Sequence, residues 1–337
     1  MSTLGISATA ININSASKTR RTPVVGYTPL KISAGQSIGR FVIDKKIGQG
    51  GFGEVWRAKD QLGRFFALKF DHLQAECDFD QEAAAFEQIQ ANGGHATIIS
   101  FLGKEKDGDL SYRIFEYVQR ENLLSHLGGV VEAEGRGLSF TQSLTYLRQI
   151  AGGVQFLHGI GLLHNDLKPD NILIVDDREL KIIDFGAATP YPAGLYGGTP
   201  MFSSPEKLFM HQIDRRSDIF SLGIIFYYML TREHPFASQT IADTKAVANI
   251  QSGKISLGLY SLPKEIRSLV SRLLAHRPED RFQTCDEMIR AIDHAIETAP
   301  KAETIWQAWM RKATRLAERL LYRFADLKQK YLHRKIG

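Results

Sequence analysis

Two short polar segments in the middle of the chain contain the residue types that transfer of a phosphoryl group requires. The first is His164-Asn165-Asp166-Leu167-Lys168-Pro169-Asp170-Asn171, and Asp184-Phe185-Gly186 begins thirteen residues after it. Such a transfer needs little covalent chemistry from a protein, but it needs a positioned nucleophile and neutralised charge. Asp166 can accept the proton of an incoming hydroxyl group, and Lys168 places a cation beside the migrating group. Asn171 and Asp184 offer oxygen atoms to Mg²⁺, a hard cation that prefers such ligands.

A glycine-rich segment closer to the N-terminus has the pattern Gly-x-Gly-x-x-Gly, formed by Gly48, Gly50 and Gly53. Glycine lets the backbone come close to phosphate oxygens and turn its N–H groups toward them. A purely structural turn and a dinucleotide-binding turn are the alternatives. The dinucleotide-binding turn would require a helix directly after Gly53, whereas residues 54–58 have the pattern of a strand. The segment is therefore predicted to be a hairpin between two strands.

Lys69 lies in the apolar segment Ala67-Leu68-Lys69-Phe70, which is predicted to be a strand. A buried lysine needs an anionic partner, and Glu82 on the next predicted helix is the preferred candidate. Glu82 stands seven residues before Ile89 and leaves the apolar face of that helix to pack on the sheet; Glu87 is the alternative partner. The pair could hold Lys69 on the α- and β-phosphates of a nucleotide. The competing interpretation is two solvated charges.

The elements that would position these residues change in type along the chain. Short strands are expected in the N-terminal part and helices in the C-terminal part, so a sheet-rich lobe precedes a helix-rich lobe. Residues 128–137 contain several Gly and Glu residues and are predicted to form a surface loop. The expected strands are 41–43, 53–59, 64–70, 98–102 and 112–118, and the expected helices are 79–89, 140–158, 217–230, 262–275 and 284–298.

Composition and charge exclude several classes of protein. The chain has 337 residues, 43% hydrophobic and 23% charged, and none of its apolar runs reaches the roughly 18 residues that span a bilayer. Its two cysteines are too few for a disulfide framework, which favours a reducing, cytoplasmic compartment. The net charge of +5 is concentrated at the ends, since residues 301–337 carry ten basic and three acidic side chains. The body between the ends is acidic, so nucleic-acid binding is not expected.

The two ends of the chain have their own patterns. Residues 1–39 contain no acidic side chain and are rich in Ser, Thr and Ala. A flexible leader is the main interpretation, and an export signal or a transit peptide is the alternative. Residues 299–337 have apolar side chains at steps of three or four, which predicts a basic amphipathic helix. This helix could dock on the rest of the chain, on a partner helix or on an anionic membrane surface, and its pattern does not choose among the three.

Taken together, these motifs resemble those of the eukaryotic-type (Hanks-type) serine/threonine protein kinases over about residues 40–296. The resemblance implies an α+β, bilobal kinase domain over 40–298. It would have an antiparallel-sheet N-lobe with one main helix (about 40–118) and a mostly helical C-lobe (about 119–298). It also implies Mg²⁺-dependent transfer of the γ-phosphate of ATP to Ser or Thr hydroxyls of a protein substrate. Further matching segments are Phe115-Glu116-Tyr117-Val118, Ser204-Pro205-Glu206, Asp218-Ile219-Phe220-Ser221-Leu222-Gly223 and Arg281.

The same resemblance implies roles for individual residues. Asp166 would be the catalytic base, Glu206 would pair with Arg281, and His164, Phe185 and Phe86 would form a stacked column between the lobes. The catalytic residues would be Asp166, Lys168, Lys69, Glu82 and Thr199, and the metal ligands Asn171 and Asp184. The residues around ATP would be Ile47, Gly48, Gly50, Gly53, Val55, Ala67, Lys69, Glu116, Val118 and Leu173.

The expected preference for Ser and Thr over Tyr rests on two segments. Lys168 follows Asp166 by two residues, whereas tyrosine kinases resemble Asp-Leu-Arg-Ala-Ala-Asn at this point. Gly198-Thr199-Pro200 also matches the serine/threonine group, in which Thr199 would bridge Asp166 and Lys168. A generic Gly-Thr-Pro turn is the alternative interpretation of that segment.

One position departs from the family, which has His-Arg-Asp where this chain has His164-Asn165-Asp166. The family's arginine receives a phosphate from the activation loop, and Asn165 carries no charge with which to do so. We therefore expect an enzyme that loop phosphorylation does not activate. The alternative function is a pseudokinase-like scaffold or allosteric partner, against which the intact catalytic residues argue. The hydroxyl-bearing residues of the loop are Thr189, Tyr191, Tyr196 and Thr199.

Overall fold

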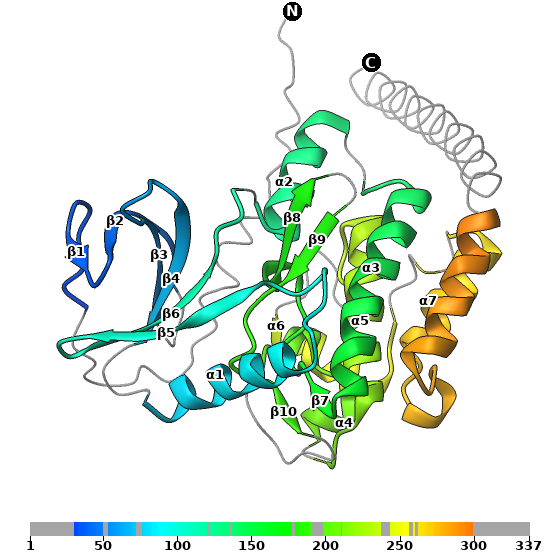
Figure 1. Ribbon diagram of the computed structural model, residues 1–337. Coiled ribbons are helices and arrows are strands. Elements are labelled where there is room, and N and C mark those ends of the chain that lie inside the picture. The colour runs from blue at the N-terminus through cyan, green and yellow to red at the C-terminus, as the bar shows by residue number, and fades with distance from the viewer. Residues whose placement is uncertain are drawn as a thin grey trace, which may run out of the picture.

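The chain folds into two lobes, as expected from its sequence (Figure 1). A sheet with one long helix forms the N-lobe, and a helical C-lobe follows it, so the predicted α+β bilobal architecture is confirmed. The predicted C-terminal amphipathic helix and most of the predicted leader lie outside the described residues. The computed structural model describes residues 30–49, 53–71, 76–119, 121–134, 137–176, 179–190, 198–209, 211–236, 243–255, 259 and 262–298.

A six-stranded antiparallel sheet forms the N-lobe, with the strand order β1-β2-β3-β4-β6-β5. Successive side chains of a strand point to opposite faces, and one face forms a core that contains Phe41, Trp56, Leu68 and Tyr112. β2 and β3 form the hairpin predicted from the glycine pattern. The strands are β1 (Ser37–Ile38), β2 (Phe41–Gln49), β3 (Gly53–Lys59), β4 (Phe65–Asp71), β5 (Phe101–Asp107) and β6 (Leu110–Glu116).

Helix α1 (Glu76–Ala91) is the long helix of the N-lobe and packs beside β5. Its buried side chains include Ala85, Phe86 and Ile89, the apolar face predicted from the sequence. Residues three or four positions apart share one face of a helix, so Glu82 lies on the same face and is buried with them. The packing of α1 therefore brings a carboxylate into the interior of the N-lobe.

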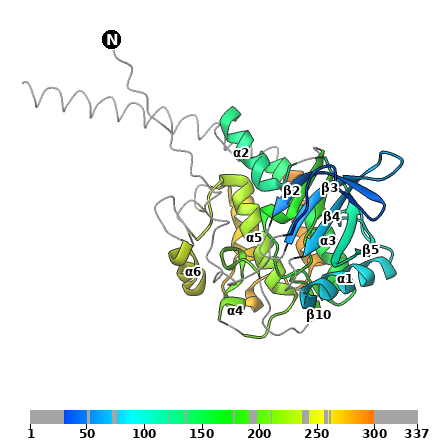
Figure 2. The same cartoon turned by 90° about the vertical axis from the view of Figure 1, so that its left-hand side faces the viewer.

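The C-lobe is built around α5 (Arg215–Thr231), whose residues from Ser217 to Leu230 are all buried. A helix that is buried on every side belongs in the centre of a lobe, and α3 (Phe140–Gly159) packs along it (Figure 1). The short α4 (Pro205–Leu208) and α6 (Asp243–Ser252) lie close together at the edge of the lobe away from the sheet (Figure 2). The other helices are α2 (Leu123–Glu134), α7 (Lys264–Leu273) and a helix over 285–298.

Four short strands of the C-lobe flank the two polar segments of the sequence. β7 (Leu162–Leu163) ends directly before His164, and β8 (Ile172–Asp176) begins directly after Asn171. β8 forms a hairpin with β9 (Glu179–Ile182), which ends two residues before Asp184. β10 (Thr189–Pro190) pairs with β7. The β8–β9 hairpin and the β7–β10 pair therefore bring the polar segments to the same side of the lobe.

Several boundaries differ from the predictions, among them that of β2, which extends to Gln49 instead of ending at residue 43. The strand expected at 98–102 is β5, which begins at Phe101, because Ile98 instead forms a bridge with Ile182. The prediction of a surface loop at 128–137 is wrong for most of that range, since α2 continues to Glu134. Ile32 and Ile38 fall within the predicted leader but are buried in the sheet core, so the ordered N-lobe begins before residue 39. None of the helices in the described ranges is long and apolar enough to cross a bilayer.

Candidate active site

A buried network of charges joins the two lobes at Lys69. The ammonium group lies 2.8 Å from Glu82 of α1 and 2.9 Å from Asp184 of the C-lobe. Burial alone would lower the pKa of Lys69, but the carboxylates of Asp184 and Glu82 outweigh it and raise this pKa above its ordinary value. Lys69 in turn holds the pKa of Asp184 below its usual range. The predicted Lys69–Glu82 pair is confirmed, and Glu87 pairs instead with Lys104.

Arg113 extends this network and was not anticipated from the sequence. It comes from β6, is 1% exposed, and contacts both Glu82 (3.1 Å) and Asp71. Strand pairing places Lys69 directly opposite Arg113, so two cations and the Glu82 carboxylate meet between two neighbouring strands and α1. A single arginine in a strand has no sequence pattern that distinguishes it from a solvated one, so this residue could be found only from the register of the sheet.

Residues 164–171, between β7 and β8, are called the catalytic loop below. The residues predicted from the sequence in this loop come together around Asp166. Lys168 Nζ lies 2.7 Å from Asp166 Oδ2 and donates to Thr199 Oγ1 at 2.9 Å. The backbone N–H of Thr199 donates to the other carboxylate oxygen, Asp166 Oδ1, at 2.7 Å. The predicted bridge by Thr199 between Asp166 and Lys168 is therefore confirmed. Each oxygen of the carboxylate has its own donor, which fixes its orientation.

Asp218 of α5 holds the start of the catalytic loop through hydrogen bonds to its backbone. Its carboxylate accepts the backbone N–H groups of His164 and Asn165, both at 3.0 Å, and lies 2.9 Å from His158 Nε2. Burial alone would raise the pKa of Asp218, but these hydrogen bonds and the two histidines lower it. The loop is thus attached to the central helix of the C-lobe, and backbone donors that would otherwise be unpaired are satisfied.

Asn171 and Asp184 have the chemistry expected of magnesium ligands. The amide nitrogen of Asn171 donates to the backbone oxygen of Asp166 at 2.9 Å, which leaves the side-chain carbonyl oxygen available to a metal ion. Asp184 uses Oδ1 for Lys69, which leaves Oδ2. The described residues contain no group of three His, Cys, Asp or Glu side chains suited to a metal. Magnesium usually takes only one or two carboxylates and completes its shell with phosphate oxygens and water, so these residues fit it.

The residues predicted to surround ATP come from both lobes. Ala67 of β4, Val118 after β6 and Leu173 of β8 are partly buried apolar side chains that pack against the same core. At Gly53 an added Cβ would lie 1.9 Å from the backbone oxygen of Phe70, so only glycine fits there. Gly48 and Val55 lie opposite each other in the β2–β3 hairpin. Ile47 of the same hairpin is exposed. The backbone N–H of Glu116 donates to the backbone oxygen of Ser100. Gly50 lies outside the described residues.

Two further predicted contacts support the arrangement of the lobes. Phe185 contacts Phe86 of α1 edge-to-face and His164 with tilted rings, and the ring centroids are 4.8 Å apart in both pairs. An aromatic column, without parallel stacking, thus crosses from one lobe to the other. Glu206 of α4 forms a two-pronged ion pair with the fully buried Arg281, at 2.7 and 2.8 Å. Paired charges of this geometry fix the segment after Thr199 to the body of the C-lobe.

Asn165 makes a contact that its neutral side chain allows. Its amide nitrogen donates to Thr189 Oγ1 at 2.7 Å and to the backbone oxygen of Ala187 at 3.2 Å. Thr189 is 4% exposed and lies in β10. The Thr199 hydroxyl accepts from Lys168, while Tyr191 and Tyr196 lie outside the described residues. The two loop threonines are therefore engaged in internal contacts.

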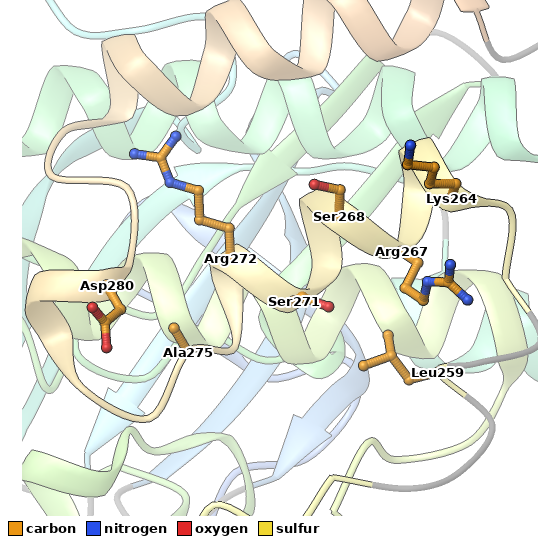
Figure 3. A pocket seen from close by; sticks show the side chains of 8 residues that line it. All are labelled: Leu259, Lys264, Arg267, Ser268, Ser271, Arg272, Ala275 and Asp280. Atoms are coloured by element: carbon orange, nitrogen blue, oxygen red, sulfur yellow. The ribbon is translucent and has the colours of Figure 1, made fainter.

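A depression of about 510 Å³ lies on the C-lobe, along one face of α7 and away from these residues (Figure 3). Three basic side chains line it, and Arg272 among them is paired with Glu287. None of the residues assigned to ATP, metal or proton transfer contributes to it. The lining residues are Leu259, Lys264, Arg267, Ser268, Ser271, Arg272, Ala275 and Asp280.

Comparison with known proteins agrees with this geometry. Residues 41–292 match the family described as protein kinase domain. The chain is 32% identical over 256 residues to an Aurora kinase of Schizosaccharomyces pombe, covering 73% of this chain and 69% of that protein. It is 32% identical over 260 residues to the serine/threonine-protein kinase PknA of Mycobacterium tuberculosis (73% and 59%). A probable serine/threonine-protein kinase of Clostridium acetobutylicum is 29% identical over 265 residues (74% and 39%). The chain thus spans between 39% and 69% of the length of these relatives.

Proposed function

The chain belongs to the protein kinase domain family, and we propose that it transfers the γ-phosphate of ATP to serine or threonine hydroxyls of proteins. Relatives from three organisms are named as kinases, two of them as serine/threonine-protein kinases, and these names support this activity. The observation that carries the proposal is the constellation around Asp166, whose carboxylate is oriented by Lys168 and by the backbone of Thr199.

In this mechanism Asp166 accepts the proton of the attacking hydroxyl group. The hydroxyl oxygen bonds to the γ-phosphorus, the bond from that phosphorus to the bridging oxygen breaks, and ADP leaves. Lys168 Nζ lies 2.7 Å from Asp166 Oδ2, so its positive charge stands directly beside the proton acceptor. A cation there neutralises charge that develops on the migrating group.

The charge network of Lys69 provides the matching site for the nucleotide. Lys69 would contact the α- and β-phosphates while Glu82 holds it in place. Asn171 and Asp184 would hold Mg²⁺, which neutralises phosphate charge when it is bound. Ala67, Val118 and Leu173 are partly buried apolar side chains, and they would enclose the adenine ring.

We further propose that phosphorylation of the activation loop is not required for activity. Asn165 replaces the charged residue that would receive the phosphate, and its amide instead donates to Thr189 and Ala187. A phosphate on Thr189 would have to enter a buried position.

The two cysteines of the chain, of which Cys285 is free and buried, support a reducing, cytoplasmic environment.

The activity is tested with labelled ATP, Mg²⁺ and generic protein substrates such as casein or myelin basic protein. Asp166→Ala removes the proton acceptor, and loss of a general base lowers the rate by about a hundredfold or more. Asp109→Ala is the matched control, because this aspartate is exposed in the turn between β5 and β6. Phosphoserine or phosphothreonine should form with the wild type and with Asp109→Ala. Equal labelling by wild type and Asp166→Ala would refute the assignment.

A further inference from the structure

Lys207 is a buried lysine that the mechanism above does not use. It lies in α4, directly after Glu206, and is 9% exposed. Lysine is among the residues least often buried, because removing an ammonium group from water is costly unless a partner compensates it. A lysine in such a position therefore calls for an explanation from its contacts.

The ammonium group of Lys207 donates a hydrogen bond to the backbone oxygen of Asn165. Gly198 closes over this contact with a φ of +97°. A Cβ at Gly198 would lie 2.6 Å from Lys207 Nζ and 2.8 Å from the Asn165 oxygen, so the position admits only glycine without displacement. Asn165, Gly198 and Lys207 thus form a tight junction, called the Asn165 junction below.

The charges around this junction explain why an ammonium group can reside there. Burial lowers the pKa of Lys207, and the carboxylates of Asp218 and Asp166 act in the opposite direction, while Lys168 adds to the lowering. Asp166 and Asp218 are both buried. These two carboxylates therefore offset part of the cost of burying the ammonium group of Lys207.

The side chain of Asn165 connects the catalytic loop to residues near Thr189, in addition to the backbone contact with Lys207. The segment from Asp184 to Glu206 is called the activation segment here. The amide nitrogen of Asn165 donates to Ala187 and Thr189 near its start, whereas Gly198 lies near its end and Lys207 directly follows it. β10, which contains Thr189, pairs with β7 directly before the catalytic loop. Both ends of the activation segment therefore converge on one residue of the catalytic loop.

The backbone oxygen that Lys207 holds belongs to the same peptide group as the N–H of Asp166. A peptide group is planar and rigid. Fixing the oxygen of Asn165 therefore also fixes the backbone nitrogen and Cα of Asp166. The Asp166 N–H donates to the backbone oxygen of His164 at 2.9 Å. Asn165 has a φ of +66°, a left-handed conformation that asparagine adopts more readily than most residues. Contacts at this peptide therefore fix the backbone of Asp166, while Lys168 and Thr199 hold its carboxylate.

We propose that Lys207 is a positioning residue, which orients Asp166 through the backbone oxygen of Asn165 and substitutes for a phosphate–arginine contact. The proposal rests on the proposed kinase activity and deepens its phosphate-independent regulation. Lys207 touches neither substrate nor ATP in this role. Its loss should therefore impair the chemical step and leave the binding of ATP unchanged.

The test compares Lys207→Met, which keeps the apolar stem and removes the donor, with Lys245→Met on the exposed surface of α6. Both are measured as full-length protein after phosphatase treatment. We expect kcat of Lys207→Met to fall about ten- to a hundredfold, equivalent to about 1.4 to 2.7 kcal/mol, with KM for ATP within about twofold of wild type. Lys245→Met should match the wild type. A folded Lys207→Met with wild-type kcat would overturn the proposal. A rise in KM for ATP as large as the fall in kcat would also overturn it, because the proposed role leaves ATP binding unchanged.

Backbone hydrogen exchange gives a measurement that does not depend on activity. In Lys207→Met the amides of residues 163–166, 198 and 199 should exchange faster while the remainder of the C-lobe is unchanged. Uniform acceleration, or none, would contradict the role. If the wild type proves inactive as a kinase, the proposed function fails and this exchange pattern still decides about Lys207. If Lys207→Met does not fold, Gly198→Ala tests the same junction from the other side, and unchanged kcat in that variant would overturn the proposal.

Discussion

Replacing Arg113 with methionine should destabilise the protein far more than removing a surface arginine. Arg113 is buried between β4 and α1, with its guanidinium group on Asp71 and Glu82. Removing one partner of a buried ion pair costs about 3 to 5 kcal/mol, because the other charge stays buried without compensation. Glu82 retains Lys69 as a partner, so most of this cost falls on Asp71. A loss of that size is a large part of the about 5 to 15 kcal/mol that stabilises a typical domain.

The pH dependence of this loss follows from Asp71. Burial raises the pKa of Asp71 above its ordinary value, and Arg113 opposes this effect; without Arg113 the pKa should rise further. A carboxyl group whose pKa is raised on folding favours the folded state when it is protonated, and this contribution is lost as the pH rises through the folded-state pKa. The difference between Arg113→Met and wild type should therefore be largest near neutral pH and shrink in mild acid.

The assay is chemical denaturation of both proteins at about pH 7.5 and pH 5.5. Arg64→Met is the control, because Arg64 is 67% exposed in its ion pair with Asp60 and such surface pairs contribute about 1 kcal/mol or less. Adding Asp71→Asn to Arg113→Met should recover much of the lost free energy of unfolding. A loss below about 1 kcal/mol at the higher pH, or a difference that does not shrink in acid, would refute this account of the network.

Three further outcomes follow from the site. Asp184→Ala should lower phosphoryl transfer by several orders of magnitude, since it removes a proposed metal ligand and a partner of Lys69; retention of more than about a tenth of the rate would contradict the proposed metal role. Calorimetric titration should show tighter ATP binding with Mg²⁺ than with EDTA, and equal affinity would count against Asn171 and Asp184 as ligands. Phosphatase treatment, checked by mass spectrometry, should leave the initial rate unchanged; a loss beyond about tenfold that rephosphorylation restores would show that Asn165 does not free the enzyme from loop phosphorylation.

The residues that carry the chemistry could be predicted from the sequence because they lie in short, contiguous segments. Asp166, Lys168 and Asn171 are separated by only a few residues, so their types and spacing already describe a site. The β2–β3 hairpin and the buried face of α1 were likewise predictable, because glycine pattern and apolar periodicity are local properties. The pairing of Lys69 with Glu82 followed from the same local argument.

Other features depend on contacts between segments that are far apart in the chain. The length of β5 was misjudged because Ile98 pairs with Ile182, a partner that no local pattern reveals. α2 continues where a loop was expected, although its sequence contains adjacent glycines. Ile32 and Ile38 are short apolar interruptions of a polar segment, and only the sheet core that receives them shows that they are part of the fold.

The sequence by itself thus determined the chemistry of the site, while the tertiary structure decided which charges support it. Arg113 and Lys207 carry no motif, and each would have been assigned to the solvated surface from its sequence alone. They are buried because β6 lies beside β4 and because α4 packs under the catalytic loop. A charge in the interior is stabilised only by partners that the fold brings to it, and those partners come from elements up to 42 residues away in the chain.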